Sequence, residues 1–565
     1  MPGTGRARRA ACAAAAVVLA LTLGSCRDTA ESTVDASSAG TPGNGGVVRV
    51  NGTRPTVPLY PGVVQDEGGT RLMDLLFRGL VRYDEDGHVV REVARSITTD
   101  DATTWRITLE KGWKFTNGEP VTSSSFVDAW NYAALGVNEQ PNASFFSPIE
   151  GYADVHPSPP GARPSAKTMS GLEVRSDTVF TVTLCHPDPT FPRRLGAVAF
   201  LPLPTVAYKD KESFGEHPVG NGPYQLGRES QPRNGMLLQA NPSFKGADVP
   251  HNGGIRITWF DRASDAYRAL REGRLDVVDT VPADRLGSFA EQLGSRSVNR
   301  PAGRLVSLSF PLDEPPWQGE RGRQLRRALS MAIDRERITG EVLHGTATPA
   351  TDFSAPVVPG WSEQLCGPTC QFRPETARRL LRRAGGLDRT LRIAYPADGG
   401  HGVWVEAVCR DIHEVLDVSC EGRPFRDGTA YRTAISSGRI GTPYRSEWRM
   451  DYPGIADFLV PRFSSGGGAN PSPGAAGAPG GYRSARFDAA VERAQRARDE
   501  DAMTEAYHDA ERVLVHDLPV IPLWNPHATG GWSPRVTDVA FGVDGFPVYP
   551  RITRTDGRTG ASSAQ

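Results

Sequence analysis

The sequence of 565 residues predicts a mixed α/β fold in which helices and short strands alternate along the chain. Segments with apolar residues at helical spacing are separated by short alternating or apolar segments that are typical of strands. The 61 glycines and 46 prolines supply the many turns that such a fold needs. A chain of this length exceeds one ordinary core, so about two to four domains are expected.

The predicted elements begin at Val47, where the composition changes from small polar residues to alternating segments. Residues 105–109 alternate as a strand, and residues 122–131 form a helix with Thr122 or Ser123 as its N-cap. Further helices are expected at 325–333, 374–384, 402–416, 487–498 and 503–516, and further strands at 180–184, 417–421 and 520–524.

The N-terminus has the pattern of a secretory signal. Three arginines precede an apolar run over residues 10–23, which is too short to span a bilayer comfortably. The run ends in Leu-Gly-Ser-Cys and resembles the bacterial lipobox, which implies a lipoprotein signal peptide over residues 1–25 and a diacylated Cys26. Two acyl chains would hold the protein on a membrane. The alternative is an ordinary cleavable signal, and residues 26–46 are interpreted as the lipidated cysteine and a flexible tether.

The charge of the chain excludes several function classes. Removal of the signal takes away three arginines and no acidic residue, so the formal charge changes from −1 to −4. No basic patch of the kind that nucleic acid requires is evident, and no second apolar run approaches the length of a transmembrane helix. A soluble body outside the cytoplasm is therefore expected, with no nucleic-acid partner.

Four cysteines are predicted to form two disulfides, which an extracytoplasmic compartment permits. Cys366 and Cys370 flank a Gly-Pro turn that brings the sulfur atoms together. Cys409 and Cys420 flank the end of a helix and the strand after it.

Cys185 remains on an alternating strand and is expected to be a buried free thiol. A zinc site is the rival interpretation of the cysteines, but His413 is the only histidine close to them in sequence. No metal or other cofactor is expected.

Motifs of catalysis are missing from the sequence. It contains neither a G-x-S-x-G elbow nor a G-x-x-x-x-G-K phosphate loop. Residues 413–417 resemble the first half of a zinc-protease motif but end in aspartate, and we interpret them as a solvated helix face. No catalytic residue is predicted, and the Gly/Ala/Pro-rich residues 466–481 are interpreted as a surface loop.

Several phrases, in order, resemble the extracytoplasmic solute-binding proteins that serve peptide and nickel ABC importers, the oligopeptide- and dipeptide-binding group. The most specific phrase is residues 105–130, with LEKGWKF, NGEPVT and FVDAW. The resemblance spans about residues 47–550, and its other phrases lie at 76–80, 83–87, 220–224, 241–244, 270–276, 326–335, 373–381 and 517–523.

The resemblance implies a two-lobed, hinged fold of the periplasmic-binding-protein type, with an additional subdomain on the first lobe. The first lobe is placed at residues 47–75, 206–302 and 522–560, its extra subdomain at 76–205, the second lobe at 303–521 and a tail at 561–565. The chain is expected to cross between lobes near Gly303 and Ile521.

The resemblance also implies where a ligand would be held. Peptide binders of this group receive the α-ammonium of the peptide on an aspartate in a W-x-x-D-Y phrase, which Trp448, Asp451 and Tyr452 reproduce here. An enclosed ammonium needs an ionised partner. The alternative for Asp451 is a loop or helix-cap residue.

Weaker site candidates concern the rest of the ligand. Arg445 and His401 match positions that meet the peptide carboxylate in some oligopeptide binders, with solvated surface positions as the alternative. Phe145 and Phe146 are expected to line the cleft from the extra subdomain, and the alternative is that they pack in the core. Glu447 stands where a glycine commonly precedes the tryptophan, and its charge narrows ligand choice.

These observations predict a monomeric, lipid-anchored receptor that captures short peptides outside the cell. It would deliver them to ABC permease subunits with their ATPases and perform no chemistry. Alternatives are a non-peptide solute (a nickel chelate, a sugar oligomer or a siderophore-like compound), a peptide-sensing signalling lipoprotein, and an envelope enzyme.

Overall fold

The computed structural model describes residues 45–158, 161–227, 234–465 and 481–555. The predicted signal peptide, Cys26, the tether up to residue 44, residues 466–480 of the predicted loop and the tail lie outside the described residues.

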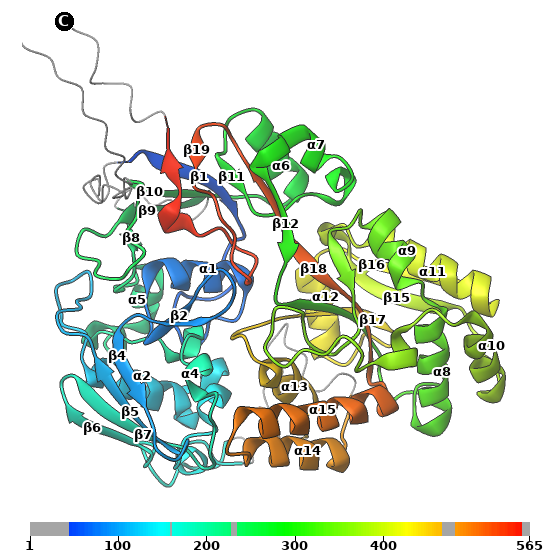
Figure 1. The fold of residues 1–565 in the computed structure, drawn as a ribbon, viewed down its shortest axis with the longest axis horizontal. Helices are drawn as coiled ribbons and strands as arrows, with labels where there is room; N and C mark the ends of the chain where they lie inside the picture. Colours follow the sequence, from blue (N-terminus) through cyan, green and yellow to red (C-terminus); the bar gives the residue numbers. More distant parts are fainter. Residues whose placement is uncertain (1–44, 159–160, 228–233, 466–480, 556–565) are drawn as a thin grey trace, which may run out of the picture. The chain divides into compact units, whose positions relative to one another are not determined.

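The largest sheet in the described residues has twelve strands, ten of which form one path (Figure 1). In order across the sheet, these are β16 (Cys420–Phe425), β15 (Leu391–Pro396), β17 (Tyr444–Arg449), β13 (Arg304–Ser309), β18 (Val520–Trp532), β11 (Val277–Val278), β1 (Val47–Gly52), β10 (Gly254–Trp259), β9 (Gly235–Ala240) and β8 (Tyr224–Leu226). Two further strands, β12 (Ser297–Pro301) and β14 (Ala347–Pro349), pair with β18. β18 therefore contacts four other strands.

A second, antiparallel sheet has the order β4 (Ala94–Thr98), β5 (Thr104–Leu109), β7 (Val179–Thr183) and β6 (Leu172–Ser176). Along β5, Trp105, Ile107 and Leu109 are buried, as alternation requires for a sheet with one covered face. Helix α2 (Ser123–Ala134) supplies Trp130, whose ring meets Phe180 of β7 at 5.7 Å. Two strand pairs complete the sheets: β2 (Val81–Tyr83) with β3 (Val89–Arg91), and β19 (Val536–Thr537) with β20 (Thr553–Arg554).

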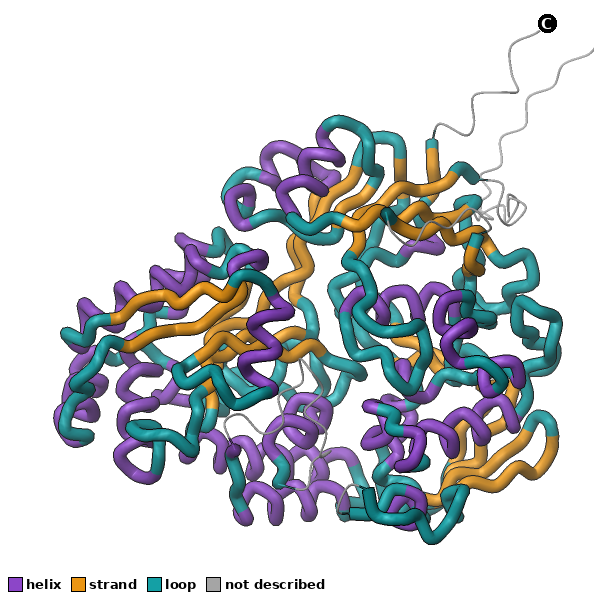
Figure 2. Tube along the Cα trace, turned by 180° about the vertical axis from the view of Figure 1, so that it is seen from behind, coloured by secondary structure: helices purple, strands orange, loops and turns teal. Residues whose placement is uncertain are grey.

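Helices and strands are mixed throughout the described chain, as the colours of Figure 2 show. The α/β fold class is confirmed. The remaining helices are α1 (Glu67–Leu76), α3 (Tyr152–Val155), α4 (Phe191–Arg194), α5 (Lys211–Glu216), α6 (Ala263–Arg271), α7 (Phe289–Leu293), α8 (Gly319–Ala332), α9 (Arg335–Arg337), α10 (Pro374–Arg383), α11 (Gly402–Leu416), α12 (Gly428–Ser436), α13 (Ile455–Phe463), α14 (Ala485–Gln495) and α15 (Glu500–Asp517).

Two large clusters of buried apolar residues form the main cores. The first takes its members from residues 48–257, with Val277, Ala302 and residues 528–552. The second takes its members from residues 306–524. The chain passes from the first cluster to the second between Ala302 and Val306, and it returns along β18 between Trp524 and Ala528.

Local signals located several elements correctly. Thr122 is the N-cap of α2, where its backbone N–H donates to the Ser125 hydroxyl at 3.1 Å, and α11 has the predicted bounds 402–416. The strand predicted at 417–421 is instead β16, beginning at Cys420. Asp417 explains the difference, because it ends α11 in the left-handed conformation (φ 55°) and the chain then needs two more residues to reach the sheet.

Both expected cysteine pairs are joined in the structure, Cys366 to Cys370 and Cys409 to Cys420. The expectation of a buried Cys185 is wrong, because this thiol is exposed. Phe180, Val182 and Leu184 occupy the buried positions of the alternation, so the odd-numbered residue after them faces outward.

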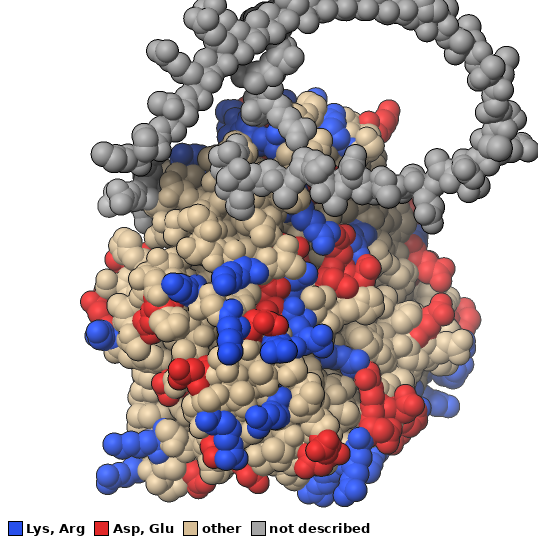
Figure 3. All heavy atoms as spheres, turned by 60° about the vertical axis from the view of Figure 1, so that its left-hand side comes forward, with Lys and Arg blue, Asp and Glu red and all other residues tan. Residues whose placement is uncertain are grey.

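Acidic and basic side chains are interspersed on the face of the molecule that Figure 3 shows. This pattern agrees with the nearly neutral composition of the chain. Among the described residues, no helix is both long enough and apolar enough to cross a membrane.

Candidate functional site

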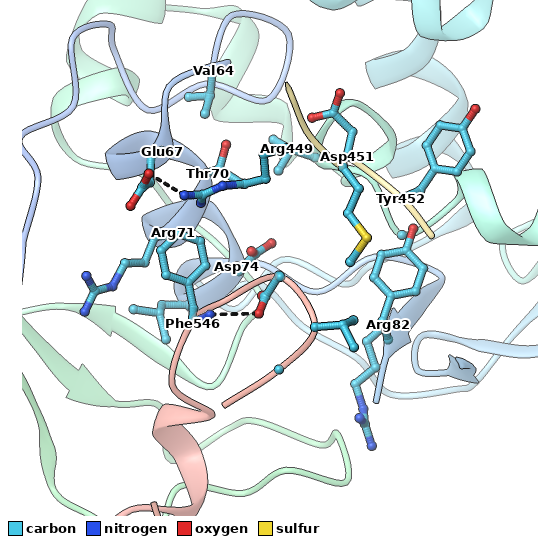
Figure 4. Close-up of a pocket in the computed structure, with 18 of the residues that line it drawn as sticks. Val64, Glu67, Thr70, Arg71, Asp74, Arg82, Arg449, Asp451, Tyr452 and Phe546 are labelled. Atoms are coloured by element: carbon cyan, nitrogen blue, oxygen red, sulfur yellow. Dashed lines mark hydrogen bonds and ion pairs between the residues drawn. The ribbon is translucent and has the colours of Figure 1, made fainter. Parts of the chain in front are cut away.

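A cavity of about 640 Å³ is lined by segments that lie far apart in sequence (Figure 4). Its volume is within the range of about 300–1,000 Å³ that is usual for small-ligand pockets. The walls come from α1 and the loop before it, from residues 77–85, from β17 with the residues after it, and from residues 542–551. The cavity is therefore lined by residues of the first core and by residues adjacent to the second core.

Helix α1 presents a polar face to this cavity. Asp66 starts the helix by accepting a hydrogen bond from the Gly69 backbone N–H at 2.9 Å. The buried face of α1 carries Leu72, Met73, Leu75 and Leu76. Residues on the other face line the cavity, and Figure 4 shows Glu67, Thr70, Arg71 and Asp74 among them.

The W-x-x-D-Y phrase lies at the end of β17. In the antiparallel register with β13, Trp448 pairs with Leu305, and its side chain is buried. The Trp448 indole N–H donates to the Asp457 carboxylate at 3.0 Å, and the Asp451 backbone N–H donates to the same oxygen at 3.0 Å. Through these two hydrogen bonds, Asp457 of α13 fixes the conformation of residues 448–451.

The Asp451 carboxylate lines the cavity and is accessible from it. Among the described residues, no side chain donates a hydrogen bond to it or forms an ion pair with it. Burial in the cavity raises the pKa of Asp451 to about 6, although the Arg449 charge opposes this shift. The site thus contains an anionic group that has no partner of its own.

Tyr452, the last residue of the phrase, also lines the cavity. Its ring lies under the Arg194 guanidinium, at 5.1 Å from the centroid, and Arg194 pairs with Asp188 at 3.2 Å. α4 thereby braces the second half of the phrase.

Charged side chains lie along one face of β17. Arg445, Glu447 and Arg449 alternate along the strand, and Arg304 of β13 lies opposite Arg449. Arg304 pairs with Glu447 at 2.6 Å, Arg445 pairs with the other oxygen of Glu447, and Arg449 pairs with Glu67 of α1. Side chains in this row are therefore mostly neutralised, in contrast to Asp451.

Four of the predicted site residues line the cavity: Phe145, Trp448, Asp451 and Tyr452. The other three do not line it. Arg445 and His401 are half-buried rather than solvated, and Phe146 is a core residue that packs against Phe200 at 5.1 Å.

His401 has a different environment from the one expected. Its ring accepts a hydrogen bond from the Trp404 indole N–H at 3.3 Å. Burial lowers its pKa to about 2, and the charges of Arg445 and Arg304 add to this shift. His401 is therefore neutral and cannot act as a cation toward a carboxylate.

Sequence reasoning missed the contribution of α1. Arg71 pairs with Asp279, which also accepts from the Asn51 amide at 2.7 Å, and Asp74 faces the cavity with its pKa raised to about 7 by burial. The cap at Asp66 signals the helix, but no local signal shows which face meets a ligand.

The predicted absence of a metal site stays a prediction. Within the described ranges, no group of three or more histidine, cysteine, aspartate or glutamate side chains is arranged to hold a metal ion. The His413 and Glu414 side chains are exposed on α11, as expected for a solvated helix face.

The sequence profile of the bacterial extracellular solute-binding proteins, family 5, matches residues 88–470. The chain belongs to this family. It is a substrate-binding protein of the ABC-transporter type rather than an enzyme, and its fold is the two-lobed one of periplasmic binding proteins.

Individual relatives of this solute-binding protein differ in their ligands. It is 25% identical over 527 residues to the probable deoxycholate-binding periplasmic protein YgiS of Escherichia coli, covering 89% of this chain and 91% of the relative. It is 23% identical over 493 residues to the oligopeptide-binding protein OppA of Bacillus subtilis, covering 82% and 85%. The solved structure of the murein tripeptide binding protein MppA of Escherichia coli has a TM-score of 0.77 at 21% identity, covering 90% and 98%.

Proposed function

We propose that this solute-binding protein captures short peptides and holds their α-ammonium group on Asp451. The observation that carries the proposal is the Asp451 carboxylate on the wall of a cavity of about 640 Å³, which has no side-chain partner among the described residues. Asp457 holds the backbone of Asp451 in place through the Asp451 N–H. The carboxylate is exposed to the cavity, so a cationic ligand group can pair with it there by a charge-assisted hydrogen bond. Oligopeptide-binding relatives and the murein tripeptide binder support the peptide class.

The proposed ligand lies between two lobes built on the two main cores. Phe145 and Tyr452 would contact its apolar parts, and the polar face of α1 would face it from the first lobe. A lipid-modified Cys26 would keep the receptor at the outer face of the membrane, and ABC permease subunits would accept the loaded form. The proposed receptor is a monomer.

The test uses residues 27–565, purified without denaturation, and native mass spectrometry of the ligands that copurify. A ladder of short peptides is expected. Replacement of Asp451 by alanine is expected to weaken peptide binding, measured by calorimetry, by at least ~2 kcal/mol. Asp100→Ala, which removes an exposed carboxylate that does not line the cavity, serves as the matched control and is expected to bind like the wild type.

A second candidate ligand follows from the relative whose name specifies deoxycholate. Such an amphipathic anion has no ammonium group for Asp451. A single non-peptide mass in the spectrum, together with unchanged affinity in the Asp451→Ala variant, would favour this ligand and contradict the peptide proposal.

A further inference from the structure

Glu447 occupies the position between two arginines that a ligand carboxylate would otherwise take. One oxygen accepts from Arg304 Nε at 2.7 Å and lies 2.6 Å from its Nη2. The other oxygen accepts from Arg445 Nη2. Both carboxylate oxygens are therefore used inside the protein.

These contacts follow from the register of β13 and β17. Glu447 and Arg445 lie two residues apart on one face of β17, and Arg304 reaches the same face from β13. The Glu447 side chain is only 15% exposed, and those of Arg445 and Arg304 are 17% and 27% exposed. Such a partly buried pair is stronger than one at the surface, because water screens it less.

Glu447 also marks one limit of the cavity. Arg304 and Glu447 belong to the cavity wall, whereas Arg445 does not. Behind Glu447, the Arg445 Nε is buried and has no hydrogen-bond partner among the described residues. Burial lowers the pKa of Arg445 to about 10. An arginine with unused hydrogen-bonding capacity thus lies directly behind the wall.

We infer that Glu447 is a built-in counter-ion that closes the cavity toward Arg445 and disfavours ligands that place a carboxylate at this end. The inference rests on the proposed function, and it names the substrate class: peptides whose C-terminal carboxylate forms no ion pair with the protein. A ligand carboxylate near Arg304 would meet the like charge of Glu447, which already accepts from Arg304 Nε and Arg445 Nη2.

The Glu447→Gln variant tests the charge of this side chain separately from its size and shape. It fills the same volume, but it removes the negative charge and accepts with only one oxygen. Arg445 and Arg304 would then have donors available for an incoming carboxylate, which arginine binds in bidentate fashion. The Glu447→Asp variant retains the charge and serves as the conservative control. Glu421→Gln makes the same change in an ion pair with Arg392 that does not line the cavity.

The experiment measures binding of alanine peptides of two to five residues, each as the free acid and as the C-terminal amide, by calorimetry on residues 27–565. For the wild type, Glu447→Asp and Glu421→Gln, the affinities for acid and amide are expected to agree within about threefold. In Glu447→Gln, the free acid is expected to bind at least about tenfold more tightly than the amide. Urea midpoints of all variants report whether each is folded.

The outcomes separate the two claims. If peptides bind but the ratio of acid to amide in Glu447→Gln equals that of the wild type, the inference is overturned and the proposed function stands. A strong preference for the free acid in the wild type also overturns it. If no alanine peptide binds to any variant, the proposed function fails, and the role assigned to Glu447 fails with it.

Discussion

Two buried aspartates, one near each main core, have opposite electrostatic environments. Asp276 is 0% exposed and accepts from Arg49 Nε at 3.0 Å and Nη2 at 2.8 Å, with Arg535 Nη2 at 3.1 Å and Arg554 Nη1 at 3.4 Å. Asp457 is 1% exposed and accepts from Trp448 and from the Asp451 backbone, while its second oxygen has no partner among the described residues.

The difference in environment sets the charge of each group. Burial opposes ionisation of Asp276, but hydrogen bonds from Arg49 and the charges of Arg49 and Arg554 outweigh it and lower the pKa. Burial raises the pKa of Asp457 well above its ordinary value, and the charge of Asp451 adds to the shift. Asp276 therefore acts as an anion that joins three arginines, whereas Asp457 acts as a neutral acceptor that positions the proposed ligand site.

The largest effect is expected from Asp276→Asn. This change leaves three arginines around a neutral side chain, so the free energy of unfolding should fall by about 3 kcal/mol, as for other broken buried ion pairs. Urea denaturation followed by tryptophan fluorescence measures the loss. A change below about 1 kcal/mol would contradict the assigned role of the charge.

The two aspartates also predict opposite dependences of stability on pH. The unfolded pKa of aspartate is about 3.9. Because the folded pKa of Asp276 is lower, its contribution is present above pH ~3.9 and is lost as the pH falls through the folded value. Because the folded pKa of Asp457 is higher, stability should increase as the pH falls from that value toward ~3.9.

Urea midpoints between pH 3 and pH 7 test this sign. Relative to Asp276→Asn, the wild type should lose its advantage at the acidic end of the range. Relative to Asp457→Asn, it should gain as the pH approaches 4. Parallel curves for all three proteins would show that neither carboxyl has the environment described.

The smallest effect is expected from Asp457→Asn. The asparagine side-chain oxygen can still accept from the Trp448 indole and the Asp451 backbone. Near pH 4, the free energy of unfolding and the peptide affinity should therefore each change by less than about 1 kcal/mol. Asp457→Ala leaves both donors unpaired and should cost about 1–3 kcal/mol in stability. Equal losses in the two variants would contradict the neutral-acceptor role.

Much of the fold follows from local signals in the sequence. Caps and apolar spacing locate α2, α10 and α11, because these signals act within a few residues. Asp417 was harder to predict, since aspartate adopts the left-handed conformation only in some contexts.

The candidate site was predictable only in part. A short phrase identified Asp451, Trp448 and Tyr452, and all three line the cavity. The effect of the Glu447 charge on ligand choice was expected, but its pairing with Arg304 was not predictable, because that pairing depends on the register between β17 and β13, which are separated by more than a hundred residues. Pairing between distant strands leaves no trace in either segment alone.

The unbroken length of β18 has a consequence for hydrogen exchange. Its residues pair with β13 and β14 beside the second core, and with β11 and β12 beside the first. Apart from Pro522 and Pro526, which have no N–H, the residues of Val520–Trp532 therefore belong to strand pairs on both sides of the passage between the cores. Any motion between the cores that preserves these bonds has to twist the strand rather than open it, so its amides should exchange slowly with or without a ligand.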